Sequence, residues 1–386
     1  MSKGRRAEKI PISENVKFLK LIDYMKTTDP NTNIIQENRI SCRSCFVTSQ
    51  FPGADIDDSQ QCKWCRSATT IQPTEAEKSS EELRQLAQEI KAKRKGKYDC
   101  IIGVSGGLDS SYVAYISKVV MGLNPLLVNY DHGFFYDAPK KNAGLLAETL
   151  GCDIRFDKSN ARWDMKYVGA ILKAFSKSRL YWGICSSCHY ILPAVVKKIA
   201  REEDIQFMMS SANEYEAQLH VSTKVKLKAM LRSFLANRII DMPGVFWNIL
   251  KAQYYFFRLK IEQYVPPIGN LVRKAPQANI INISLTSFIP WNIKKIRGVL
   301  STELGWQTPQ TPNLGMRFDC MIEDSYINHT YKSVTGSTIH AIIANNLIYD
   351  NLSTKSELAP IVEHYDRIIT DRQQQVKEKI LSAGNP

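Results

Sequence analysis

Residues 100–111 constrain the fold more than any other segment of the chain. The apolar run 100–104 is followed by Ser105, Gly106 and Gly107, and then by polar residues that suit the start of a helix. Two glycines let the backbone turn sharply and approach a ligand without a Cβ atom in the way. The start of a helix supplies N–H groups and a partial positive charge that bind phosphate. The segment therefore predicts a strand, a tight turn and a helix around a phosphate or pyrophosphate site.

The same segment excludes one common class of nucleotide site. No lysine follows the glycines at the spacing of the G-x-x-x-x-G-K-S/T loop. A tight strand-to-helix turn with good capping residues and no ligand is the alternative interpretation.

Short apolar runs alternate with helical patterns along the middle of the chain. Strands are expected near 99–104, 125–130, 153–157 and 205–210, and helices near 109–121, 138–150 and 188–203. This alternation predicts an α/β fold with a doubly wound parallel sheet. Ligands of such sheets bind at the carboxyl ends of the strands, where Ser105 and Asp131 both fall. Asp131 is interpreted either as a ligand of a nucleotide ribose or a metal, or as an exposed acid in a turn.

Two cysteine pairs near the N-terminus have the spacing of a metal site. The sequence C-x-x-C occurs twice with sixteen residues between the pairs, at Cys42, Cys45, Cys62 and Cys65. Four thiolates in two such pairs are typical of tetrahedral structural zinc. A catalytic zinc is disfavoured because four protein ligands leave no open position, and disulfides are the alternative to a metal.

Composition and charge indicate a cytoplasmic protein with a polyanionic partner. The formal net charge is +13, and lysines and arginines cluster within 91–97 and 224–238. Nucleic acid, anionic lipid and a nucleotide-sugar would each be attracted, while solvated helix faces are the alternative. No apolar run is long enough for a membrane span, and the first residues do not form a secretory signal.

The organisation along the chain is predicted as four parts. Residues 1–38 form an N-terminal extension, 39–72 the zinc module, 73–97 a linker helix and 98–386 the main domain. Ser79-x-x-Glu82 has the pattern of a capping box, which places the start of the linker helix there. The aromatic and basic stretch 222–262 is open to three interpretations: buried helices, a partner surface or a membrane-surface patch.

The order of these blocks resembles a known family. The loop at Ser105 looks like the S-G-G-x-D-S loop of PP-loop ATP pyrophosphatases. From about residue 39 to 306 the chain is similar to the N-acetyl sugar amidotransferases of that superfamily. The matching blocks are the two cysteine pairs, residues 98–107, the turn 130–133, and two later segments at 289–291 and 303–306. Leu108 departs from the lysine that is usual in the family's loop.

The resemblance implies a definite reaction. ATP adenylates the acetamido oxygen of a UDP-linked N-acetyl sugar, ammonia attacks the activated carbon, and AMP leaves as an acetamidino group forms. Gly106 and Gly107 would hold the pyrophosphate, with hydrogen bonds from the Ser105 and Ser110 hydroxyls. Asp109 would position Mg²⁺ or the helix start, which makes Asp109 and Ser110 the candidate catalytic residues. The product belongs to bacterial surface polysaccharides, including lipopolysaccharide O-antigen.

The resemblance also implies a partner protein. The chain lacks the G-x-C-x-G nucleophile turn of one glutaminase class, and residue 2 is serine rather than the N-terminal cysteine of another. A separate glutaminase subunit, similar to that of imidazole glycerol phosphate synthase, is therefore expected to supply ammonia.

A PP-loop tRNA thiolation enzyme is the alternative function. Such enzymes also join a zinc module to this loop, and a basic surface suits RNA. Many carry a second zinc module near the C-terminus, whereas this chain has no C-x-x-C after residue 188. Nucleic acid is therefore the less favoured partner, and a non-catalytic zinc-bearing module is disfavoured by the intact loop.

The cysteines outside the zinc module leave three interpretations open. Cys185 and Cys188 form a third C-x-x-C pair, and Cys320 lies much later. They are interpreted as inert packing residues, as a redox disulfide, or as a second metal centre. By analogy with other PP-loop enzymes the last would be an iron–sulfur cluster on three thiolates, which leaves one iron open. That hypothesis requires Cys320 to come within ligand distance of Cys185 and Cys188, near the mouth of the Ser105 loop.

Overall fold

The computed structural model describes residues 40–51, 53–67, 76–181, 183–211, 242–264, 280–285, 288–289, 292–307, 320–349 and 353–383. The chain divides into two compact units, Met1–Arg39 and Ile40–Pro386, and the second contains all described residues. The predicted extension 1–38, the basic cluster 224–238 and Pro290-Trp291 lie outside the described residues.

A five-stranded parallel sheet forms the centre of the fold. Its strands are β1 (Cys100–Gly103), β2 (Pro125–Tyr130), β3 (Ile154–Asp157), β4 (Phe207–Ser210) and β5 (Ile281–Ser284). The order across the sheet is β3-β2-β1-β4-β5, and every neighbouring pair is parallel. The prediction of a parallel α/β sheet is confirmed, and β5 is an additional strand that the sequence pattern does not reveal. The direction of chain progression reverses between β1 and β4, which is where ligands bind in such sheets.

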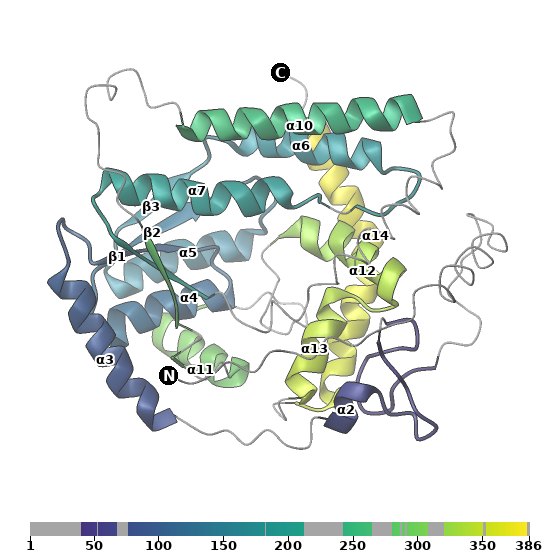
Figure 1. Cartoon of the computed structure of the whole chain (residues 1–386), viewed down its shortest axis with the longest axis horizontal. Helices are drawn as coiled ribbons and strands as arrows, with labels where there is room; N and C mark the ends of the chain where they lie inside the picture. The colour runs from purple at the N-terminus through teal and green to yellow at the C-terminus, as the bar shows by residue number, and fades with distance from the viewer. Residues whose placement is uncertain are drawn as a thin grey trace, which may run out of the picture. The chain divides into compact units, whose positions relative to one another are not determined.

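Helices cover both faces of the sheet, as expected for a doubly wound fold (Figure 1). Side chains alternate between the faces along each strand. Ile102 and Leu127 belong to one core with the helices α3 (Ala76–Ala92), α4 (Leu108–Tyr115), α5 (Asp137–Leu150) and α11 (Ile293–Leu304). Ile101 and Leu126 belong to a second core with α7 (Ser186–Glu202) and α10 (Met242–Tyr264). All four side chains are almost fully buried. This two-sided burial explains why these strands are continuous apolar runs.

Three helices around the first four strands lie close to the predicted positions. They are α4 (Leu108–Tyr115), which continues as the π-helical turn η2 (Ile116–Val120), α5 (Asp137–Leu150) and α7 (Ser186–Glu202). The helix α6 (Ala161–Ala174) is an additional helix that the sequence pattern does not predict. The prediction that Ser79 caps the start of the linker helix is wrong, because this helix, α3, runs over Ala76–Ala92 and already contains Ser79. Two further helices are α2 (Lys63–Ser67) and α11 (Ile293–Leu304).

The C-terminal part forms a helical group beside the sheet (Figure 1). It contains η6 (Glu323–Ile327), α12 (Asn328–Thr335), α13 (Ile339–Tyr349) and α14 (Lys355–Ala383). Tyr326 and Val376 are buried in one core with residues of α6. Among the described residues, none of the helices combines the length and apolarity that a membrane crossing requires.

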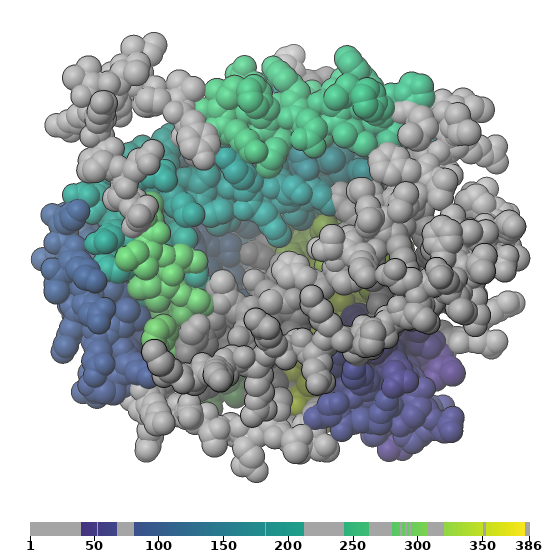
Figure 2. Space-filling view, viewed as in Figure 1, coloured from purple at the N-terminus to yellow at the C-terminus, as the bar shows by residue number. Residues whose placement is uncertain are grey.

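The helix α10 (Met242–Tyr264) presents two different faces. Ala252 and Leu259 are fully buried against α6 and α7, and the surface of α10 adjoins theirs in Figure 2. Phe246, Trp247 and Phe257 are each more than half exposed. The described part of the 222–262 stretch is therefore a helix that is buried on one side only.

Candidate active site and metal centre

The predicted phosphate loop joins the carboxyl end of β1 to α4. The backbone N–H of Val104 donates to the carbonyl of Val128 on β2 at 2.8 Å, and the Asn129 side chain donates to the Val104 carbonyl at 2.7 Å. The hydroxyl of Ser105 accepts from the Gly107 N–H at 3.2 Å, and the Ser110 hydroxyl accepts from the Ser105 N–H at 3.2 Å. Hydrogen bonds to its own serine hydroxyls therefore hold the loop closed. Both serines also line a cavity, which is described below.

Gly106 is the residue that allows this turn. Its φ of +82° lies in the left-handed region, where a Cβ atom is strained. A Cβ built at this position would lie 1.8 Å from the backbone oxygen of Pro139, at the start of α5. The turn and the close approach of α5 both require glycine here.

Residues far away in the sequence hold the Gly106 peptide in place. The indole N–H of Trp306 donates to the Gly106 carbonyl at 3.1 Å, and the Asn142 amide donates to the same oxygen at 3.3 Å. Asn142 also exchanges two hydrogen bonds with the backbone of Gln307. Trp306 is noticed in the sequence only as part of a late block, and its role in supporting the loop is visible only in the fold.

A cavity of about 560 Å³ opens at the predicted position, between the carboxyl ends of β1 and β4. Ser105 and Ser110 line its polar end, and Tyr130, Val196 and Met209 are among its other lining residues. This volume suits a nucleotide-sized ligand. Asp109 lies half-buried in the first turn of α4, next to Ser110 in the chain, and is not among the residues that line this cavity.

Asp131 follows β2, as predicted, but it is neither exposed nor among the residues lining this cavity. It is buried and forms an ion pair with Lys140 at 2.9 Å. Its Oδ1 accepts the Gly133 N–H at 2.9 Å. Burial opposes ionisation, but Lys140 and the Gly133 N–H hold the pKa of Asp131 below its usual value. The interpretation as an exposed turn acid is wrong, and the role in ATP binding stays a prediction.

A second, smaller cavity brings the late cysteines to the phosphate loop. It has a volume of about 180 Å³, and we name it the cysteine cavity, because Cys185, Cys188 and Cys320 line it together with Ser105 and Asp164. Cys320 reaches this position through an antiparallel bridge to Phe135. The three late cysteines therefore line one cavity beside the phosphate loop, while the requirement that Cys320 lie within ligand distance of the pair stays a prediction.

Close sulfur packing distinguishes the two sets of cysteines. Cys42, Cys45, Cys62 and Cys65 form a group whose sulfur atoms all lie within 4.8 Å of one another. Within the described ranges, it is the one group of three or more candidate metal ligands that are this close. The sulfur atoms of Cys185, Cys188 and Cys320 do not form such a group. These three residues are therefore not arranged for a single tetrahedral ion, and the iron–sulfur interpretation stays a prediction.

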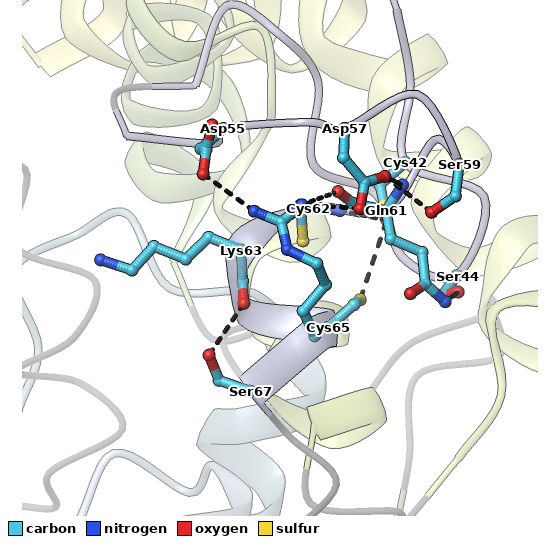
Figure 3. A network of polar contacts seen from close by, with 11 residues as sticks. Cys42, Ser44, Asp55, Asp57, Ser59, Gln61, Cys62, Lys63, Cys65 and Ser67 are labelled. Carbon is cyan, nitrogen blue, oxygen red and sulfur yellow. Dashed lines mark hydrogen bonds and ion pairs between the residues drawn. The ribbon is translucent and has the colours of Figure 1, made fainter.

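The four N-terminal cysteines have the geometry of a tetrathiolate site, and Figure 3 shows three of them, Cys42, Cys62 and Cys65. The Cys42 and Cys65 sulfurs are 3.8 Å apart and those of Cys45 and Cys62 are 3.6 Å apart. Zn–S bonds of about 2.3 Å in a tetrahedron require a sulfur separation of about 3.8 Å. A disulfide requires about 2.05 Å, so the disulfide alternative does not hold in this structure.

The environment of the four thiols favours a bound cation. Contact with Cys65 lowers the pKa of Cys45 to about 5, whereas burial raises the pKa of Cys62. Four thiols at this separation cannot all ionise unless a positive charge compensates them, and a divalent ion supplies that charge. The Tyr349 hydroxyl lies 3.4 Å from the Cys45 sulfur and provides an outer-shell partner from α13.

Further contacts attach the cysteine module to the C-terminal helices. The Phe46 N–H donates to the Asn345 side chain at 2.7 Å, and the Lys355 ammonium donates to the Cys42 carbonyl at 2.6 Å. The Ser337 hydroxyl donates to the Phe46 carbonyl at 3.3 Å. A metal in the module would therefore also stabilise the contact between the cysteine module and the C-terminal helices.

No family model matches the chain. A curated relative, the glutamine-hydrolyzing GMP synthase of Pyrobaculum aerophilum, is 28% identical over 100 residues, which are 26% of this chain and 19% of the relative. The match thus spans about a fifth of that relative's length.

Solved structures with weak similarity were also found. The U34-tRNA thiolase NcsA of Methanococcus maripaludis, with its 4Fe-4S cluster, is 16% identical and has a TM-score of 0.34, covering 86% of this chain and 88% of that chain. The NH3-dependent NAD synthetase of Campylobacter jejuni is 15% identical, with a TM-score of 0.28 and coverage of 50% and 99%. The NMN synthetase of Francisella tularensis is 13% identical, with a TM-score of 0.28 and coverage of 63% and 100%. These scores are too low to support an assignment. The phosphate loop on a parallel sheet and the GMP synthase match together indicate the PP-loop ATP pyrophosphatase superfamily.

Proposed function

We propose that the chain is an enzyme that uses ATP to adenylate an oxygen of its substrate and releases pyrophosphate. The observation that carries this proposal is the position of the Ser105 loop: its two serine hydroxyls line a nucleotide-sized cavity at the point where the sheet order reverses. The Gly106 turn is pressed against α5 and tied to Trp306, so the cradle is rigid before any ligand binds. Preorganised donors of this kind stabilise charge that develops on phosphate oxygens.

The substrate we propose is the acetamido group of a UDP-linked N-acetyl sugar. An amide oxygen is a poor leaving group, and transfer of AMP converts it into a good one that ammonia can displace. The loop N–H groups and the hydroxyls of Ser105 and Ser110 would hold the pyrophosphate, and Asp109 would hold Mg²⁺, which neutralises charge on the phosphates. A nucleotide-sugar is anionic, in agreement with the net charge of +13. The sequence resemblance supports this choice of substrate.

Ammonia is proposed as the nucleophile, supplied by a separate glutaminase. The curated relative is named for glutamine hydrolysis, which favours nitrogen transfer in this chain as well. The four-cysteine centre is proposed to hold structural zinc, because its four thiols fit a closed tetrahedral site and leave no open position.

The products of the reaction test the proposal directly. With Mg-ATP, ammonium and a UDP-N-acetyl sugar, the enzyme is expected to form AMP and pyrophosphate in equal amounts. Asp109→Ala is expected to lower the rate by about 10²–10³-fold, since it removes a charged group beside the phosphates. The circular dichroism spectrum and melting temperature of the variant should match the wild type, because the side chain is only half-buried. ADP as the main product would refute the adenylation mechanism.

The source of ammonia gives a second prediction. High ammonium at alkaline pH should support turnover by the chain alone, because the neutral amine is the nucleophile. Glutamine should support turnover only after a glutaminase subunit is added, which can be measured as AMP release with and without that subunit. Glutamine-dependent AMP release by the isolated chain would contradict the partner requirement.

A tRNA thiolation enzyme remains the second candidate. The cysteine cavity favours it, since three cysteines beside Ser105 are suitably placed to carry sulfur to an adenylated base. Purified protein with a high 260/280 nm absorbance ratio that falls after ribonuclease treatment would favour this candidate. Activity with a UDP-N-acetyl sugar and ammonium would favour the amidotransferase.

A further inference from the structure

Asp164 is a buried carboxylate that the proposed ATP site does not use. It lies on α6, is only 1% exposed, and lines the cysteine cavity beside Ser105. Its Oδ2 accepts a hydrogen bond from the hydroxyl of Tyr130, at the end of β2. Within the described part of the chain, its buried Oδ1 has no partner with the geometry of a hydrogen bond, although the Ser187 hydroxyl lies close enough to the carboxylate to influence its charge.

An unpartnered carboxylate oxygen in a buried position is costly, because desolvation disfavours the charged form unless a donor or a cation compensates it. Burial raises the pKa of Asp164 to about 6, while the Tyr130 and Ser187 hydroxyls partly offset this effect. The group is therefore still ionised near neutral pH and is able to take up a proton. A small positively charged donor would satisfy Oδ1.

The cavity limits which donor can bind. Its volume of about 180 Å³ is too small for a nucleotide-sugar, but at about 30 Å³ for each water it admits a small ion together with several waters. The rings of Phe134 and Phe135 line it, and aromatic faces attract cations. His132 on the same wall is kept neutral, because burial lowers its pKa to about 4. A histidine cation therefore does not compete for the carboxylate.

From this arrangement we propose that the cysteine cavity binds ammonium and that the Asp164 carboxylate accepts its proton. This inference rests on the proposed amidotransferase function. It identifies the place from which the nucleophile approaches, since Ser105 lines both this cavity and the larger nucleotide-sized one.

The step balances without any further reactant. Ammonium transfers one proton to Oδ1 of Asp164, which yields ammonia and a neutral carboxylic acid. The nitrogen lone pair forms a C–N bond with the adenylated carbon, the C–O bond to AMP breaks, and AMP leaves with that electron pair. Departure of AMP leaves the product as the amidinium cation, whose new N–H protons come from ammonia. The proton on Asp164 passes to solvent water, which restores the carboxylate. The other titratable groups around the cavity are Tyr130, His132, Cys185, Cys188, His189, Cys320 and Glu323.

The substitution Asp164→Asn tests the assignment, because it removes the charge and keeps the side-chain shape. The matched control is Asp371→Asn, which makes the same change at an exposed position of α14. For Asp164→Asn, the KM for ammonium is expected to rise at least about tenfold and kcat to fall by about 10²-fold or more. Exchange of labelled pyrophosphate into ATP, which reports adenylation alone, should stay within about twofold of wild type in this variant, as should the ammonium KM of Asp371→Asn. These rate measurements need a working amidotransferase.

Calorimetric titration of the full chain with ammonium chloride, against sodium chloride at equal ionic strength, does not depend on activity. Saturable binding in the wild type that disappears in Asp164→Asn is expected.

Absence of binding in the wild type would overturn the inference even if AMP and pyrophosphate are formed. Loss of pyrophosphate exchange in parallel with turnover would overturn it too, because Asp164 would then serve adenylation. Iron in anaerobically purified protein that is lost on Cys188→Ser would assign the cavity to a cluster instead of ammonium. Failure of the wild type to form AMP with any N-acetyl sugar would overturn the proposed function separately.

Discussion

The substitution Gly106→Ala is expected to abolish turnover and to destabilise the fold. The left-handed φ of +82° alone costs about 1–2 kcal/mol for a residue with a Cβ atom. The added methyl group would also lie 1.8 Å from the Pro139 backbone oxygen, so the loop or the start of α5 must move. A displacement of about 1 Å at a catalytic site lowers rates by about 10²-fold, and the Trp306 and Asn142 hydrogen bonds to this peptide would be lost as well. AMP formation and the free energy of unfolding measure the two effects.

Gly144→Ala is the matched control for this prediction. Gly144 lies in α5, five residues beyond Pro139, and nothing lies within 4 Å of a Cβ atom built there. Alanine in a helix interior is expected to raise stability by about 0.5–1 kcal/mol and to leave turnover unchanged. A Gly106→Ala protein as active and as stable as Gly144→Ala would show that the loop geometry is wrong.

Loss of one thiolate from the four-cysteine centre is expected to have the other large effect. Cys62→Ser should release the bound zinc, because the remaining three ligands cannot complete the tetrahedron. Structural zinc contributes on the order of 10 kcal/mol to the folding of small modules. The module also contacts the C-terminal helices through Phe46 and Cys42, so a lower melting temperature of the whole unit is expected. Metal analysis and thermal melting, with and without a chelator, check this result.

Cys152→Ser is the control for the metal prediction. Cys152 is half-buried, and its thiol contacts the Leu150 carbonyl at 3.7 Å, remote from the four-cysteine group in the sequence. One zinc per chain in this variant and none in Cys62→Ser is the expected pair of results. Equal zinc contents in the two variants would overturn the four-ligand assignment.

Local signals account for the elements that the sequence predicts well. Strand β2 occupies 125–130, the predicted range, because an apolar run bounded by turn residues marks both ends. Strand β5 is missed because it has only four residues and two of them are exposed, so no buried apolar run marks it. Ser79 and Glu82 match the capping pattern but lie inside α3, because that helix already begins at Ala76.

The candidate site divides in the same way. The Ser105 loop and the two C-x-x-C pairs consist of residues a few positions apart, so their chemistry is visible in the printed sequence. Asp164 carries no such signal, because an acid within an amphipathic helix usually faces solvent. Its partner Tyr130 is 34 residues away, and their hydrogen bond exists only because β2 and α6 pack together.

By itself, the sequence determined the parallel α/β sheet, the loop at its centre and the group of four cysteines, because hydrophobic periodicity, glycine positions and cysteine spacing act over a few residues. Only the tertiary structure decided what supports these features. Trp306 reaches Gly106 across 200 positions, and Tyr349 reaches Cys45 across 304. Such contacts depend on how the helices pack on the sheet and on each other. That packing arises from the whole chain burying its apolar surface at once, and no short stretch of sequence encodes it.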